Sequence, residues 1–164
     1  MKFQTTKNQE NYFLSQPHQP FFTLGIVNSV LFMLVFALSY KGVFSLHVSV
    51  PFFHAYSLIF LVFTNFFIGF LFTTFPRFTQ GEVIKKAFYI KLFYANTIGT
   101  LLFMIGVFTS EILVIFAMVL LFVSQIFMVL KLRDIYANSR TQNKKDPFWI
   151  LNAQYFGLAG HLFL

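Results

Sequence analysis

The chain has 164 residues, of which 57% are hydrophobic, 21% are aromatic and only 10% are charged. Because soluble domains carry about 25% charged residues, this composition excludes an ordinary water-soluble fold and predicts a polytopic, all-α membrane protein. The net charge of +7 is distributed between apolar stretches and forms no basic, aromatic-interleaved domain, so no nucleic-acid partner is expected. The chain has no cysteine, which excludes disulfides, thiolate metal sites and iron–sulfur clusters.

Five apolar segments follow one another, each close to the ~20 residues that a membrane-spanning helix needs. They cover residues 20–40, 52–75, 88–108, 111–132 and 147–164. The prolines support these limits, because Pro20, Pro51 and Pro147 stand where the first turn of a helix tolerates proline. Pro76 ends the second segment. The sequence therefore predicts a transmembrane bundle of five helices, preceded by a cytoplasmic tail at residues 1–19.

The basic residues fix the expected orientation of this bundle. One side of the membrane receives Lys2, Lys7, Arg77, Lys85, Lys86, Lys91, Lys131, Arg133, Arg140, Lys144 and Lys145. The opposite side receives Lys41 alone. Under the positive-inside rule, this distribution places the N-terminus in the cytoplasm.

The final apolar segment, 147–164, reaches Leu164 without a charged or polar flank. Either it is a short last helix, or the chain is part of a longer protein. We expect the second, in which case further helices of the same protein, or a second copy, would complete the bundle.

Histidines are the main candidates for chemistry, because an imidazole in an apolar span is costly unless it is hydrogen-bonded or bound to a metal. His54 lies in the first, external turn of the second span, and His161 lies fourteen residues beyond Pro147. At 1.5 Å per residue, His161 is about 20 Å across the membrane, in the same external half as His54. His18 lies at the cytoplasmic mouth of the first span, and His47 is a loop residue.

Helical phase gives His54 its expected neighbours. At about 100° per residue, Ser57, Leu61 and Asn65 share its face, whereas Tyr56 points to the opposite side. These residues indicate a binding face, or an ordinary packing contact between membrane helices.

His161 has its own face on the fifth predicted span. Gln154 and Gly157 share that face, at spacings of seven and four residues. A glycine one turn from a histidine clears space beside the imidazole, as a flat macrocycle needs. Small residues are also common where membrane helices pack together, so both readings stay open.

Several motifs resemble those of the NnrS family of membrane proteins. The stretch HAYSLIF, beginning at His54, is similar to the family's WHAHEM-like motif. A GFLLTAVPNWTG-like helix exit follows fifteen residues later, with Gly69 at its start and Pro76 through Gly81 at its end. The segment 15–25, SQPHQPFFTLG, is similar to the RPFFLL-like start of the family's first helix, and the tail 154–164 to a later helix with a histidine.

This resemblance implies a bacterial inner-membrane protein of about twelve helices that contains haem and copper and takes part in the response to nitric oxide. The chain departs from the family motif where the second histidine falls on Tyr56 and the glutamate on Ser57. Phe53 replaces the motif tryptophan and Gln19 an arginine. Only His54 carries over as a motif histidine.

The favoured hypothesis is therefore an NnrS-like haem protein of nitrosative stress. His54 and His161 are the first candidates as ligands of b-type haem or of copper, and His18 is the third candidate for haem. The expected partners of the protein are the lipid bilayer and nitric oxide. A quinol-linked redox subunit, with Tyr56 or Tyr155 on a proton route, is the second hypothesis. A cofactor-free transporter or assembly factor is the third. No catalytic residue is assigned, and enzyme activity is left open.

Overall fold

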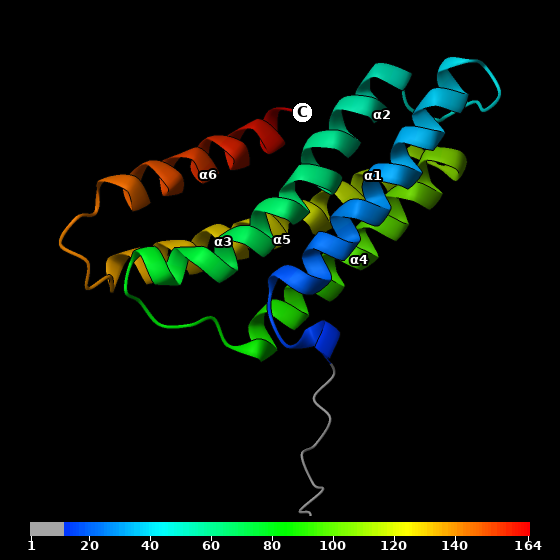
Figure 1. Cartoon of the computed structure of the whole chain (residues 1–164). Coiled ribbons are helices and arrows are strands. Elements are labelled where there is room, and N and C mark those ends of the chain that lie inside the picture. The colour runs from blue at the N-terminus through cyan, green and yellow to red at the C-terminus, as the bar shows by residue number, and fades with distance from the viewer. Residues whose placement is uncertain (1–11) are drawn as a thin grey trace, which may run out of the picture.

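The computed structural model describes residues 12–164, and in that range it contains helices and no strand (Figure 1). The elements are η1 (Tyr12–Leu14), α1 (His18–Tyr40), α2 (Val50–Tyr56), η2 (Ser57–Phe63), α3 (Thr64–Phe78), α4 (Lys86–Thr109), α5 (Glu111–Ala137) and α6 (Lys145–Phe163). The all-α prediction is confirmed. Lys2 and Lys7, in the expected tail, lie outside the described residues.

Four helices of the described chain are long and apolar enough to cross a membrane: α1, the continuous helix Val50–Phe78, α4 and α5. The prediction of five such spans is wrong by one. The fifth segment forms α6, but its apolar residues are interrupted by Asn152, Gln154 and His161. Helix α6 lies beside α5, and its C-terminal end approaches α2 (Figure 1).

The second span is a single helix with a π segment inside it. Its start is fixed by Pro51 in the first turn and by Ser49, whose side chain accepts a hydrogen bond from the backbone of Phe52. Between Ser57 and Phe63 the backbone widens into the π-helix η2 and then continues as α3. Such insertions occur frequently at functional sites.

The second span ends in a turn that is hydrogen-bonded to the linker between α5 and α6. The backbone N–H of Gly81 donates to the carbonyl of Pro76 at 2.8 Å and closes α3. The carbonyl of Thr79 accepts hydrogen bonds from the backbone N–H groups of Arg140 and Thr141. The exit from α3 therefore holds the linker between α5 and α6 against the bundle.

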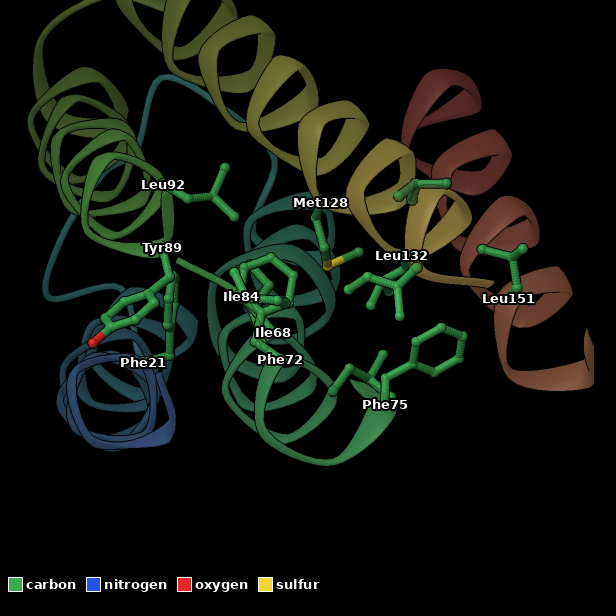
Figure 2. Close-up of a cluster of buried hydrophobic side chains, with 13 residues drawn as sticks. Phe21, Ile68, Phe72, Phe75, Ile84, Tyr89, Leu92, Met128, Leu132 and Leu151 are labelled. Atoms are coloured by element: carbon green, nitrogen blue, oxygen red, sulfur yellow. The ribbon is translucent and has the colours of Figure 1, made fainter. Parts of the chain in front are cut away.

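The apolar core is divided into two clusters near opposite ends of the bundle. The first, around α3, includes Phe21 and Phe72 together with Met128 and Leu132 of α5 (Figure 2). The second gathers around α2 and η2 and comprises Phe32, Phe53, Tyr56, Phe60, Leu61, Phe103, Val107, Val114, Ala117 and Leu121. Polar side chains lie between the two clusters and form part of the candidate site.

Two glycines let α4 and α5 approach closely. A Cβ atom at Gly99 would lie 2.7 Å from Cγ of Leu121, and one at Gly106 would lie 2.8 Å from the backbone nitrogen of Val114. Small residues at helix contacts are a common way to pack membrane helices. The close packing of the α4–α5 hairpin therefore depends on the absence of a side chain at Gly99 and Gly106.

Candidate functional site

A buried cluster of three polar side chains joins α2, α5 and α6. The hydroxyl of Tyr56 is 2.8 Å from Nε2 of His161, and Oε1 of Gln125 is 2.7 Å from Nδ1 of the same ring. A carbonyl oxygen only accepts, so Nδ1 carries the proton and donates to Gln125. Nε2 then accepts the hydrogen bond that Tyr56 donates. We call these residues the histidine cluster.

Aromatic rings hold this imidazole in place. Phe60 stacks on His161 with a centroid distance of 4.0 Å and an interplanar angle of 22°. Phe122 meets the ring edge-on at 5.4 Å, and Tyr56 itself stacks on Phe103 at 4.9 Å. His161 is only 5% exposed, and Tyr56 is fully buried. The orientation of the imidazole is therefore set by packing as well as by hydrogen bonds.

His54 has a different environment, although it is two residues from Tyr56. Its ring stacks on Phe36 of α1, with centroids 4.0 Å apart and an interplanar angle of 21°. Its Nδ1 atom is buried and has no hydrogen-bond partner. Since His161 contacts Tyr56, the two histidines lie at the same end of the bundle, but they face different helices.

His18 lies at the other end, where α1 begins. Its Nδ1 is 3.4 Å from Oγ1 of Thr73, and its ring meets Phe22 edge-on at 6.0 Å. His47 is an exposed loop residue. Within residues 12–164, no three histidine, aspartate or glutamate side chains are close enough together to share a metal ion. The structure thus does not bring the three predicted ligands into one site.

A central polar layer separates the two apolar clusters and consists of Asn28, Asn65, Asn96 and Ser124. The carbonyl of Leu61, in the π segment, accepts from Nδ2 of Asn28 at 2.7 Å and from Nδ2 of Asn65 at 2.8 Å. Asn96 donates to Oγ of Ser124 at 2.6 Å. Each of these residues lies near the middle of its span. The bonds of Asn28 and Asn96 join separate helices, as amide contacts do in membrane bundles, whereas the bond of Asn65 lies within its own helix.

Asn65 differs from the other residues of this layer in its hydrogen bonding. It is fully buried, yet its Oδ1 atom has no hydrogen-bond partner. A buried acceptor without a donor lowers stability, so helix packing alone does not account for an asparagine here.

Asn65→Leu should therefore leave the free energy of unfolding unchanged within about 0.5 kcal/mol or raise it, because Asn28 still donates to the Leu61 carbonyl. The matched change Asn96→Leu breaks a bond between helices and should cost about 0.6–1.7 kcal/mol. Unfolding in mixed micelles measures both. A clear loss for Asn65→Leu would show that Oδ1 has a partner in solution.

Sequence reasoning missed Gln125, although a signal was present. Ser124 and Gln125 are two consecutive polar residues at the centre of α5, the most hydrophobic of the four spans. The phase argument placed Tyr56 opposite His54, and the two rings do pack against different helices. Nothing in the local pattern indicated that the partner of Tyr56 would be His161, which is 105 residues away.

The fold and the site together define a polytopic helical membrane protein with a buried histidine cluster and a polar layer at mid-membrane. The family model described as "NnrS protein" matches residues 12–164, which is the whole of the described chain. The chain belongs to the NnrS family. No curated protein and no solved structure matches it.

Proposed function

We propose that this protein binds b-type haem in the bacterial inner membrane and takes part in the response to nitric oxide. The observation that carries the proposal is the buried, unpartnered Nδ1 of His54. An imidazole nitrogen in that state costs free energy unless it gains a ligand. Neutral imidazole is the commonest metal ligand among side chains.

The surroundings of His54 suit this role. Phe36 stacks flat on the ring and restricts its rotation, and the neighbouring Phe53 is fully buried and helps to exclude water. Haem iron, when bound, would supply a site with high affinity for nitric oxide, which is itself small, apolar and soluble in the membrane. His54 would hold the iron, while the phenylalanines would keep the site dry.

His161 fits less directly as a ligand, because both of its ring nitrogens already have partners. Coordination through Nε2 would require the hydroxyl of Tyr56 to move aside. The bond from Nδ1 to Gln125 would remain, and it is the kind of outer contact that orients a ligand histidine. His18, at the opposite end of the bundle, is the third candidate.

Copper is the less supported part of the proposal. A copper site on His54 or His161 needs further nitrogen, sulfur or oxygen ligands. Among the described residues, no three histidine or carboxylate side chains gather to supply them.

We further propose that the N-terminus is cytoplasmic. Of the ten lysines and arginines within residues 12–164, nine belong to the end that carries the α3–α4 and α5–α6 linkers, and Lys41 alone belongs to the other. The positive-inside rule then places those linkers in the cytoplasm.

The test is an absorption spectrum and an iron determination on the purified protein. We expect a Soret band that shifts when nitric oxide is added. His54→Ala should abolish or shift that band, whereas His47→Ala, which changes an exposed loop histidine, should not. A protein with neither a Soret band nor iron would overturn the proposal. Unchanged spectra in both His54→Ala and His161→Ala would reject these ligands.

One observation favours a second function, a quinol-linked redox subunit. Such a protein needs a group that can pass protons inside the membrane, and Tyr56 donates its O–H to Nε2 of His161 within 2.8 Å. Tyr155, the other tyrosine considered, is 40% exposed. Quinol oxidation that is lost in Tyr56→Phe and kept in Tyr155→Phe would support this function over the first.

A further inference from the structure

A groove of about 390 Å³ lies between α4 and α5. Its apolar walls are formed by Phe88, Leu92, Ala95, Leu120, Val123 and Phe127. Phe127 is 54% exposed, so the groove opens on the outside of the bundle. This surface belongs to two of the four helices that are long and apolar enough to cross a membrane, so lipid acyl chains would reach it in a bilayer.

Two polar residues, Lys91 and Ser124, also line this α4–α5 groove. Lys91 lies on the side of the basic linkers, five residues after the start of α4, and Ser124 lies near the middle of α5. The hydroxyl of Ser124 already accepts a hydrogen bond from Asn96. The hydroxyl of Ser124 therefore needs no further partner, and the rest of the groove suits an apolar occupant.

The length of the groove agrees with part of an acyl chain. On α4 the lining residues run from Phe88 to Ala95, and on α5 from Leu120 to Phe127. Seven residues of helix rise about 10 Å. The groove therefore extends from the level of Phe88, about one turn before Lys91, toward the middle of the two helices.

The positive charge of Lys91 determines which class of lipid the groove would bind. Lys91 is exposed, and in the part of the chain that the structure describes, the observed ion pair, Lys131 with Asp134, does not involve it. An ammonium group above an apolar groove attracts a ligand with an anionic head and an apolar tail. The leaflet on the side of the basic linkers, which the positive-inside rule makes cytoplasmic, is the one rich in anionic lipid.

We propose that the α4–α5 groove is a binding site for one anionic phospholipid. One acyl chain lies along the apolar walls, and the phosphate pairs with Nζ of Lys91. A free phosphate ion would gain nothing from the apolar walls. A second copy of this chain could cover the groove but would leave Lys91 without an anion. The site is independent of the proposed haem.

Native mass spectrometry of the detergent-purified chain, titrated with phosphatidylglycerol or phosphatidylcholine, tests the proposal. We expect one tightly retained phosphatidylglycerol and weaker retention of phosphatidylcholine. Lys91→Gln should weaken phosphatidylglycerol binding roughly fivefold, the effect of one basic residue near an anionic headgroup. Lys85→Gln removes the same charge next to α4 but outside the groove, and it should leave binding unchanged.

Ala95→Leu tests the apolar part, because a larger side chain would fill the groove without changing its charge. It should reduce retention of both lipids, and its thermal unfolding in detergent shows whether the bundle has stayed folded. Equal retention of the two lipids would overturn the proposal. So would equal losses in Lys91→Gln and Lys85→Gln, or a dimer that excludes the lipid.

Discussion

Replacing His161 with phenylalanine should lower the free energy of unfolding by about 1–3 kcal/mol. The new ring can still stack on Phe60, so the change removes hydrogen bonds and preserves packing. It leaves the hydroxyl of Tyr56 and Oε1 of Gln125 buried without partners. Hydrogen bonds between membrane helices are worth about 0.6 kcal/mol on average and up to about 1.7, and two are lost here.

A double-mutant cycle with Tyr56→Phe separates the two bonds. If the pair is coupled, the double variant should be less destabilised than the sum of the single variants, because neither partner is left alone. His47→Phe makes the same chemical change at an exposed loop position and should stay within about 0.5 kcal/mol of the parent. Additive effects in the cycle would mean that Tyr56 and His161 are not hydrogen-bonded in solution.

Replacing Gly106 with alanine should destabilise the protein by about 1–3 kcal/mol, the usual range for overpacking. The added Cβ would lie 2.8 Å from the backbone nitrogen of Val114 and 3.1 Å from the backbone carbonyl carbon of Leu113. Backbone atoms cannot rotate away as a side chain can. The α4–α5 hairpin would have to separate, and thermal unfolding in detergent would report the loss.

Gly160→Ala is the matched control for this change. It also places a methyl group on a helix, but no atom lies within 4 Å of the new Cβ. Alanine is the better helix former, so this variant should be unchanged or more stable by up to about 1 kcal/mol. Equal effects at Gly106 and Gly160 would contradict the close approach of α4 and α5.

Composition and proline placement were sufficient to predict the helical class, because a membrane leaves few alternatives for a chain this apolar. Pro51 and Pro76 mark the ends of the second span, and the structure places both in its terminal turns. The prediction of a fifth span is wrong for α6, because Asn152, Gln154 and His161 interrupt its apolar residues. These polar side chains lower the hydropathy of α6, which is not among the four described helices that are long and apolar enough to cross a membrane.

The candidate site was less predictable than the fold. His54 and His161 stand out in the sequence because they interrupt apolar helices. Their partners do not, because the contacts of His161 with Tyr56 and Gln125 join residues 105 and 36 positions apart. A phase of 100° per residue also assumes an uninterrupted α-helix, which the π segment Ser57–Phe63 does not provide.

The π segment lies between two polar sites on one helix. Tyr56 precedes it and belongs to the histidine cluster, whereas Asn65 follows it and belongs to the central polar layer. A π turn inserts one residue into an α-helix, and one residue corresponds to about 100° of rotation. The insertion therefore acts as an angular offset: it sets the direction in which Asn65 points relative to Tyr56. In an uninterrupted α-helix, the nine residues from Tyr56 to Asn65 would put the two side chains about 180° apart, whereas one inserted residue reduces this angle to about 80°.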